Sequence, residues 1–469
     1  MRYFILIISF LATTISSAQS LGYSDLGLLF SQENYQGTAR FNAMAGAFGA
    51  LGGDVSATYI NPASGAIFNK NQLSGSLSLS SLDTDATYYG TRSFNNASSF
   101  RNGQLGGVFI FETQLNSDWS KTAFGVNYSV TQDFKNNYRV TGNNENYGRY
   151  NIHPFDTSDP AIPYNLTKEQ TFTNITDGKQ EVYSFSLSSA YQNLFYLGAS
   201  INFHHTDFIQ NSYLNEVNED ENGNALYAEY YQQLSEIASG VSLGLGIIVK
   251  PIQNVRLGLA YQSPVWNTEV IENSNAIDYD TSNNYNDALE QGELEIFSSD
   301  IEGTYYNAPE NPEILSFVYG INTPSKFTAS FAYIFDRWGL ISIDYATKDY
   351  SSIKLQDAYE FSSENNYIQS TFGQAGTLRV GGELRVKQFS FRGGAYLEES
   401  PYKNSQDNYY KQGLTAGLGL QFSNSTLDFA YEHSQYDSSY NIYTPIENIN
   451  PANLDNSNAR FTATLSIQF

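Results

Sequence analysis

The sequence contains no cysteine, only two methionines and three tryptophans, and few basic residues. A chain without cysteine has no disulfide scaffold, no zinc ribbon and no thiol nucleophile. Lysine and arginine number 24 against 48 aspartates and glutamates, which gives a formal net charge of −24. A protein this acidic cannot neutralise a row of phosphates, so we expect no nucleic-acid partner.

Long apolar runs are also missing. A transmembrane helix needs about 18 or more consecutive apolar residues, and the longest candidate, 240–249, is about half a helical span. Aromatic residues, in contrast, make up 15% of the chain, with 37 tyrosines and 31 phenylalanines. Disordered chains are poor in aromatics, so this composition, with its many Gly, Ser and Asn residues, indicates ordered β-structure.

Residues 1–18 have the pattern of a secretory signal peptide. Arg2 supplies a positive start, 3–12 form a short apolar core, and Ser16-Ser17-Ala18 provides a small-residue cleavage site. The apolar core is too short for a membrane anchor. An exported chain without transmembrane helices is either soluble or a β-barrel.

Alternation of apolar and polar residues decides between these two classes. Phe461, Ala463, Leu465 and Ile467 alternate with polar residues up to Phe469, which is the period of a strand with one apolar face. Collecting such runs predicts strands at 72–82, 103–112, 120–134, 181–192, 194–207, 238–250, 252–265, 325–336, 338–350, 375–387, 388–398, 412–422, 424–436 and 459–469. These are fourteen, an even number, as in single-chain bacterial outer-membrane barrels.

The connections between these strands alternate in length. Short turns are expected at 192–193, 251–254, 336–339, around Lys387 and at 423–425. Long loops are expected at 83–102, 135–180, 208–237, 266–324, 351–374, 399–411 and 437–458. Short periplasmic turns and long extracellular loops are typical of outer-membrane barrels. The sequence therefore predicts an all-β protein, a fourteen-stranded antiparallel transmembrane β-barrel in the bacterial outer membrane.

The segment 19–71 is too irregular for barrel strands and is rich in Gly and Ala. Fourteen strands enclose more space than their own side chains fill, so a compact segment inside the lumen is expected to act as a plug. We therefore divide the chain into a signal peptide (1–18), an N-terminal hatch (19–71) and a barrel with long acidic extracellular loops (72–469).

The segment 37–64, GTARFNAMAGAFGALGGDVSATYINPAS, resembles the N-terminal hatch of the FadL/TodX outer-membrane transport family. That hatch has a small-residue stretch followed by an Asn-Pro-Ala motif, which here is Asn61-Pro62-Ala63. The segments 255–265, 323–335 and 378–402 are similar to strands of the same family. The resemblance covers nearly the whole mature chain.

The resemblance implies outer-membrane transport of hydrophobic small molecules, of the long-chain fatty acid or aromatic hydrocarbon type, by passive diffusion. Ligands of that family enter through an outer groove, pass an interior site, and leave through a lateral opening at a kinked third strand. Some relatives in Bacteroidetes-like bacteria are instead subunits of secretion machinery. The alternative is therefore a structural or accessory subunit of an outer-membrane secretion or assembly complex. The expected partners are outer-membrane lipid and either a hydrophobic ligand or such a complex.

An interior site of this kind needs apolar walls and a cation that holds a carboxylate. Strand alternation directs four arginines into the lumen, because an arginine that faces lipid at mid-bilayer costs about 2–4 kcal/mol. These candidate ligand-binding residues are Arg256, Arg379, Arg385 and Arg392. In the competing interpretation they pair with lumen carboxylates and hold the hatch to the wall. The candidate carboxylates are Asp54, Asp344, Glu383, Asp428 and Glu432.

The loop 266–324 contains twelve carboxylates and no lysine or arginine. It is either a solvated face that binds divalent cations or the rim of the outer capture groove. As a rim, it would disfavour anionic ligands at the entrance.

One calcium-loop pattern is present. Asn218, Asp220, Asn222 and Glu229 occupy its positions 1, 3, 5 and 12, with Gly223 at position 6. Position 1 is Asn where Asp is usual, and no helical pair surrounds it, so a plain Asn-Gly turn is the competing interpretation. Four histidines without a Ser-His-acid spacing favour a protein that is not an enzyme. No cofactor is expected beyond this calcium candidate.

Overall fold

The computed structural model describes residues 21–112, 117–145, 148–275, 293–307, 314–404, 409–443 and 449–469. The predicted signal peptide and six of the twelve carboxylates of the 266–324 loop lie outside these ranges. No helix within the described ranges is long and apolar enough to cross a membrane.

Fourteen antiparallel strands close into a barrel, because β1 pairs with β2 on one side and with β20 on the other. The wall strands are β1 (Gln72–Tyr88), β2 (Thr91–Glu112), β3 (Trp119–Asp133), β5 (Leu166–Tyr191), β6 (Phe195–Glu219), β7 (Ala225–Ile252), β8 (Val255–Gln262), β13 (Lys326–Phe335), β14 (Gly339–Asp349), β16 (Gln374–Val386), β17 (Phe389–Glu399), β18 (Tyr409–Gln421), β19 (Ser425–Tyr440) and β20 (Ala452–Gln468). The predicted fold is confirmed.

Strand β1 shows why the wall forms. Its outward residues Leu77 and Leu79 are 52% exposed, whereas the inward residues Ser74, Ser76 and Ser78 are at most 3% exposed. An apolar outer face and a polar inner face are the pattern of a barrel in lipid. We call the end with the turns at Gln192 and Lys387 the short-turn end, and the opposite end the mouth.

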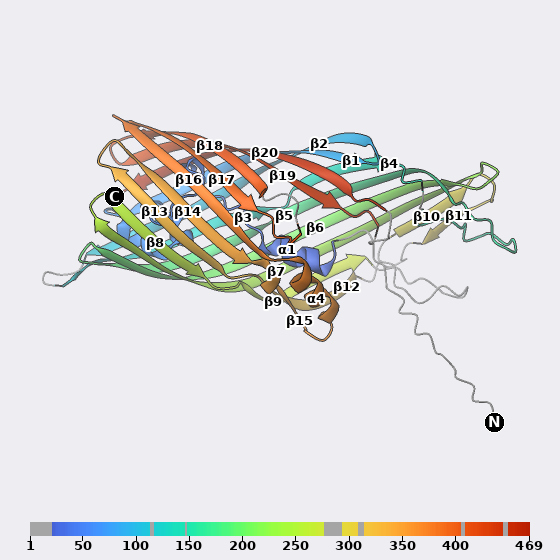
Figure 1. Ribbon diagram of the computed structural model, residues 1–469, viewed down its shortest axis with the longest axis horizontal. Coiled ribbons are helices and arrows are strands. Elements are labelled where there is room, and N and C mark those ends of the chain that lie inside the picture. The colour runs from blue at the N-terminus through green and yellow to red at the C-terminus, as the bar shows by residue number, and fades with distance from the viewer. Residues whose placement is uncertain are drawn as a thin grey trace, which may run out of the picture.

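Strands β5, β6 and β7 extend far beyond their predicted bounds and project at the mouth (Figure 1). The expected loops 135–180, 208–237 and 266–324 therefore contain much strand. The inward faces of the extensions carry both apolar and polar residues, so that Phe208 and Leu214 are buried there beside Gln210 and Glu216. Additional strands at this end are β4 (Asn136–Gly142), β9 (Trp266–Asn275), β10 (Glu293–Ser298), β11 (Thr304–Asn307), β12 (Ile314–Asn322) and β15 (Lys354–Gln356).

Two neighbouring wall strands are interrupted at the same level by prolines. Strand β8 gives way to β9 around Pro264, and β12 gives way to β13 around Pro324. Proline has no backbone N–H and cannot donate a hydrogen bond to a neighbouring strand. At this level a side chain accepts instead of a backbone carbonyl: Val265 N donates to Thr323 Oγ1 at 3.0 Å. Beyond this line β9 pairs with β7 and β12, and β12 pairs with β15. We call β9, β12, β15, the 3₁₀ helix η2 (Tyr350–Ser352) and helix α4 (Ser362–Thr371) the cap.

The described residues before β1 form short helices that contact the inner wall and are drawn in blue in Figure 1. They are α1 (Tyr23–Ser31), α2 (Ala39–Ala43), α3 (Ala57–Ile60) and the 3₁₀ helix η1 (Pro62–Ile67). We call residues 21–71 the N-terminal segment.

Backbone of the N-terminal segment lies against wall positions that lack a side chain. A β-carbon on Gly258 would lie 2.5 Å from Gly49 O, and one on Gly394 would lie 2.7 Å from the carbonyl carbon of Met44. Both distances are shorter than real β-carbon contacts. The segment can occupy this position only because the wall carries glycine there.

Neighbouring glycines of β16 offer a matched test. A β-carbon on Gly381 would overlap the Met44 carbonyl, whereas one on Gly382 would lie 3.6 Å from its nearest neighbour. We expect Gly381→Ala to displace the N-terminal segment, which should raise single-channel conductance and expose the segment to protease. Gly382→Ala should leave both unchanged, and both variants should keep heat-modifiable gel mobility. Equal behaviour of the two variants would contradict this packing.

Candidate functional site

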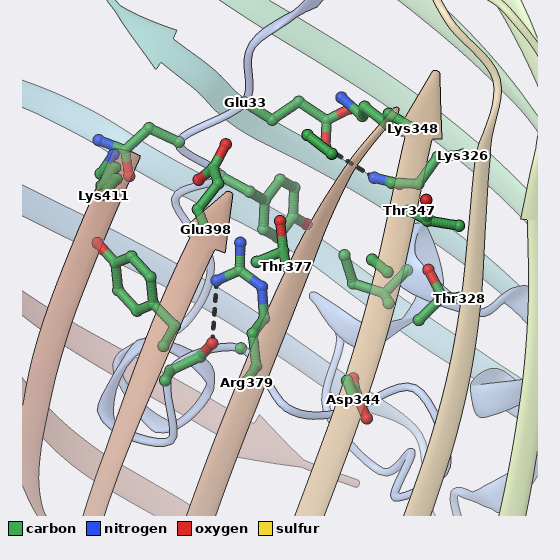
Figure 2. Close-up of a pocket in the computed structure, with 18 of the residues that line it drawn as sticks. Glu33, Lys326, Thr328, Asp344, Thr347, Lys348, Thr377, Arg379, Glu398 and Lys411 are labelled. Carbon is green, nitrogen blue, oxygen red and sulfur yellow. Dashed lines mark hydrogen bonds and ion pairs between the residues drawn. The ribbon is translucent and has the colours of Figure 1, made fainter. Parts of the chain in front are cut away.

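A cavity of about 80 Å³ lies between the N-terminal segment and strands β13, β14, β16, β17 and β18 (Figure 2). Nine of its 23 lining residues are charged, and they stand among apolar and neutral polar ones. The cations are Lys326, Lys348, Arg379, Lys411 and Arg460, and the carboxylates are Glu33, Asp344, Glu398 and Glu432. We call it the lumen cavity. Its surroundings suit a charged headgroup better than a hydrocarbon tail.

One carboxylate bridges two lysines at the edge of this cavity. Lys326 and Lys348 are direct partners across the β13–β14 ladder, where like charges repel. Glu33 lies between them, with Oε2 at 2.7 Å from Lys326 Nζ and Oε1 at 3.0 Å from Lys348 Nζ. Lys348 also donates to Ser31 O at 2.9 Å. Burial raises the pKa of Glu33, but the two ammonium groups outweigh burial and hold this pKa well below its usual range.

Arg379 is the predicted arginine that lines the cavity. Its Nη1 donates to Ala45 O at 3.1 Å, and its guanidinium lies 5.2 Å from the ring centroid of Tyr396. Asp344 is its direct partner across the β14–β16 ladder, yet within the described ranges no carboxylate lies at ion-pair distance from Arg379. Arg379 therefore carries a charge whose hydrogen-bonding capacity is only partly used.

Two other predicted arginines are held by carboxylates. Arg392 lies between Glu383 at 2.6 Å and Asp428 at 2.7 Å, and its side chain is 3% exposed. Arg385 contacts Glu383 at 2.5 Å, and Arg40 of the N-terminal segment contacts the same carboxylate at 2.9 Å. The interpretation that these arginines pair with lumen carboxylates thus describes Arg385 and Arg392.

Arg256 and the Asn-Pro-Ala motif hold the N-terminal segment by backbone contacts. Arg256 donates to Leu51 O. The Asn61 amide donates to Gly49 O at 2.7 Å and to Ile247 O of β7 at 3.3 Å, while its oxygen accepts from Ala63 N at 3.1 Å. Pro62 begins η1, where a missing N–H costs nothing. The motif thus closes a turn and ties it to the wall.

The four calcium candidates do not converge. Asp220 accepts from the backbone of Asn222 and Asn224 at 2.8 Å each, within the turn that joins β6 and β7. Asn218 is buried and donates to Tyr150 O, whereas Glu229 is exposed on β7. Across the described ranges, no group of three or more His, Cys, Asp or Glu side chains is arranged to hold a metal.

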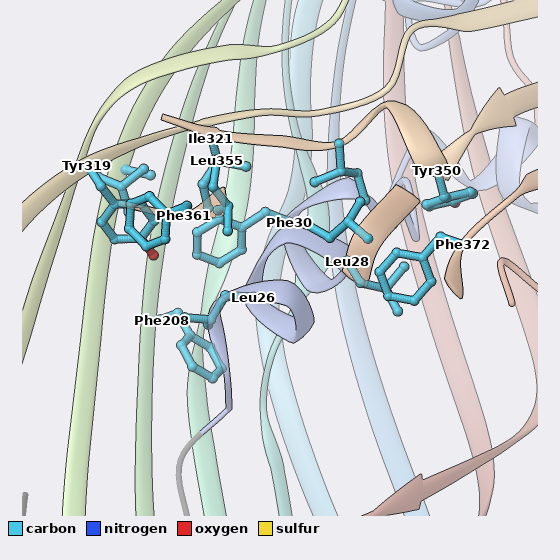
Figure 3. Close-up of a cluster of buried hydrophobic side chains, with 14 of the residues drawn as sticks. Leu26, Leu28, Phe30, Phe208, Tyr319, Ile321, Tyr350, Leu355, Phe361 and Phe372 are labelled. Atoms are coloured by element: carbon cyan, nitrogen blue, oxygen red, sulfur yellow. The ribbon is translucent and has the colours of Figure 1, made fainter. Parts of the chain in front are cut away.

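An apolar cluster fills the mouth around helix α1 (Figure 3). Leu26, Leu28 and Phe30 of α1 are buried against residues of β6, β12, β15, η2 and α4. These neighbours include Phe208, Tyr319, Ile321, Tyr350, Leu355, Phe361 and Phe372. The cluster holds α1 between the projecting wall strands and the cap.

Strand β3 has an irregularity between Val130 and Gln132. The β2–β3 ladder runs only from Gln104 toward the short-turn end, and beyond it Arg101 of β2 contacts Asp133 at 3.1 Å and Asp177 at 2.9 Å. A cavity of about 230 Å³ lies beside this interruption, lined by β2, β3 and the N-terminal segment. Strand β3 is the third strand of the wall, the one at which the resemblance leads us to expect a lateral opening.

Sequence reasoning did not single out Glu33, Lys326 or Lys348. The alternation of Phe327, Ala329 and Phe331 would have directed Lys326 inward, so the lysines carried a usable signal. The position of Glu33 depends on how the N-terminal segment sits in the barrel, and no local pattern contains that information.

A scan of protein-family models finds no match for the chain, and a search of curated proteins finds none. Solved structures do match. A Pseudomonas aeruginosa FadL homologue has a TM-score of 0.59 at 13% identity, covering 94% of this chain and all of that one. The P. putida toluene transporter TodX (TM-score 0.52, 13% identity, 94% and 99% covered) and the Ralstonia pickettii toluene transporter TbuX (0.50, 15%, 93% and 99%) are also similar. The chain therefore has the fold of FadL-type barrels, as the resemblance predicted.

Proposed function

We propose that this protein is an outer-membrane channel for hydrophobic small molecules, with its short-turn end in the periplasm and its N-terminal segment as the plug. The observation that carries the proposal is the likeness over 94% of the chain to a FadL homologue, together with likeness to proteins described as toluene transporters. The apolar outer face of the wall supports a place in a membrane.

The lumen cavity is too small for a hydrophobic ligand, whereas the neighbouring cavity beside β3 measures about 230 Å³. A cavity that holds benzene measures about 150 Å³, and the lumen cavity measures about 80 Å³. A hydrophobic ligand can enter it only if residues 33–46, which line one side, move. The Glu33 bridge to Lys326 and Lys348 is therefore a contact that passage must break.

Arg379 is the group best placed to hold a ligand carboxylate. It lines the cavity, lacks an ion-pair partner among the described residues, and lies beside the aromatic ring of Tyr396. A neutral hydrophobe would not use it. From the cavity, the interruption between β2 and β3 offers an exit into the membrane, where Arg101 would have to release Asp133.

The alternative, a subunit of an outer-membrane secretion or assembly complex, is favoured by one observation. Two aromatic pairs stack on the outward face of the projecting strands, Tyr213 with Tyr231 and Tyr227 with Phe297, each with ring centroids 4.8 Å apart. Tyr213 is 41% exposed and Tyr227 is 37% exposed. Exposed aromatics are common in protein interfaces. Native gel electrophoresis of gently solubilised membranes tests this alternative, which requires a mass well above that of one chain.

Uptake of a long-chain fatty acid and of its methyl ester tests the role of Arg379. Loss of one charge-assisted hydrogen bond removes about 1.5–3 kcal/mol, so Arg379→Ala should reduce uptake of the acid roughly tenfold or more and spare the ester. Arg392→Ala is the control, because its loss disturbs Glu383 and Asp428 and should affect acid and ester alike. An equal effect of Arg379→Ala on both ligands would show that Arg379 is structural. Failure of the unsubstituted protein to pass either ligand would contradict the proposed channel.

Conductance of Glu33→Gln tests the plug. The amide leaves Lys326 and Lys348 opposed without a counter-ion, so openings should become at least roughly tenfold more frequent at pH 7. The depressed pKa of Glu33 means that its contribution is present above about pH 4.3, the ordinary value for Glu, and is lost as pH falls below it. In the unsubstituted protein the lumen bridge should therefore weaken as the pH falls below about 4.3, whereas the variant should not respond to this step. Glu364→Gln, at a half-buried position on α4, is the control. If the Glu33→Gln channel stays closed at pH 7, the bridge between Glu33 and the two lysines does not hold the plug in place.

A further inference from the structure

Two glutamates face each other at the mouth without a basic partner. Glu236 of β7 and Glu272 of β9 are direct partners in the β7–β9 ladder. Both point inward, and they are 0% and 5% exposed. Carboxylates so deeply buried normally pair with a cation.

The groups around the two carboxyls are hydroxyls, rings and other acids. Tyr319 Oη donates to Glu236 Oε1 at 3.3 Å, and Tyr23 of α1 donates to Glu272. Glu360, before α4, is the other charged group that acts on Tyr23, and β6 places Phe208 opposite Glu236. Within the described ranges, no lysine, arginine or histidine acts on either carboxyl.

The position of the remaining oxygen indicates a shared proton. Glu236 Oε2 is buried and receives no hydrogen bond from any other donor in the described structure. The two carboxyl groups are close neighbours, because Glu236 and Glu272 are direct partners in the ladder and both are buried. Two buried carboxylates cannot both ionise at this separation, so one proton between them satisfies both. Burial, with the charge of Glu272, raises the pKa of Glu236 to about 9, and burial also raises the pKa of Glu272.

The pair joins the wall, the cap and the N-terminal segment. Glu236 belongs to the wall and Glu272 to the cap, while the Tyr23 ring of α1 lies edge-on to Tyr319 at 5.3 Å and to Phe361 at 4.9 Å. The cap continues from the wall through the interruptions at Pro264 and Pro324, where the ladder is already broken. Repulsion between the two glutamates would therefore act on the joint at which cap, wall and α1 meet.

We propose that Glu236 and Glu272 form a proton-operated clasp, which holds the cap and α1 against β7 while the two carboxyls share a proton and releases them when both ionise. The clasp concerns the opening of the mouth and does not depend on which ligand the barrel passes.

The direction of the pH effect follows from the raised pKa values. The closed state binds more protons than the open one, so closure is strongest below about pH 4.3, the ordinary glutamate value, and weakens as pH rises toward about 9.

A chain without cysteine permits a direct test by thiol labelling. Ala238→Cys places a thiol in the mouth cluster, at a position that is 1% exposed, and Ser363→Cys places one at an exposed position on α4. The ratio of their labelling rates with a methanethiosulfonate reagent removes the intrinsic pH dependence of the thiolate. We expect this ratio to rise about tenfold or more from pH 5 to pH 9.

Glutamine variants separate the clasp from other causes. Glu236→Gln and Glu272→Gln each prevent double ionisation, so the labelling ratio should stay low and nearly flat, and both should retain heat-modifiable gel mobility. Tyr319→Phe removes a hydrogen bond that favours ionised Glu236, so it should shift opening to higher pH. A flat ratio in the unsubstituted protein, or an unchanged pH response in both glutamine variants, would overturn the proposal. Opening by a chelator at pH 5 would overturn it too, because a metal ion would then hold the pair.

Discussion

Contact between two backbones inside the barrel is the constraint on which the rest of this structure depends. A fourteen-stranded wall encloses more volume than its own side chains fill, and here residues 21–71 occupy the space. They approach so closely that Gly258 and Gly394 leave no room for a β-carbon. Because the segment and the wall fit in one position, the charged contacts, the small lumen cavity and the placement of α1 beneath the cap all follow from this packing.

Several of the few basic residues of the chain lie where the segment meets the wall. Arg40 and Arg392 meet at Glu383, Arg256 contacts the backbone of the segment, and Lys326 and Lys348 share Glu33. A buried cation without a partner destabilises the fold. Most of these cations have a partner across the boundary between the N-terminal segment and the wall. The lumen therefore offers few free positive charges, and a ligand that needs one would compete with the protein for it.

Alternation predicted the wall because the wall strands have an apolar outer face and a largely polar inner face. The expected strand 375–387 corresponds to β16 (Gln374–Val386), and 325–336 corresponds to β13 (Lys326–Phe335). The same reasoning failed at the mouth, where 208–237 was expected to be a loop. There α1 and the cap cover the inner face of the strands. Apolar residues are therefore buried on the inner face as well, and the simple alternation of an apolar outer and a polar inner face is lost. The alternation of residues along the strand predicted that Arg392 points inward. That Glu383 and Asp428 are its partners could not be predicted, because this depends on the register between neighbouring strands. Glu236 and Glu272 carried no signal, because β9 meets β7 only beyond the interruption at Pro264.

The apolar cluster at the mouth and the lumen bridge are joined through one lysine. Helix α1 fills the mouth through Leu26, Leu28 and Phe30, and it ends at Ser31. Lys348 binds both the Ser31 carbonyl and the Glu33 carboxylate, so the end of the mouth helix and the lumen bridge share one ammonium group. A displacement of α1 would therefore change the surroundings of an ammonium group that also belongs to the lumen bridge. Loss of the Glu33 carboxylate, in contrast, leaves the bond from Lys348 to the Ser31 carbonyl in place, so the two contacts can also respond separately, as the opposite pKa directions of Glu33 and Glu236 require. The connection between them is short, because only the nine residues of α1 and the two that follow lie between the mouth cluster and Glu33.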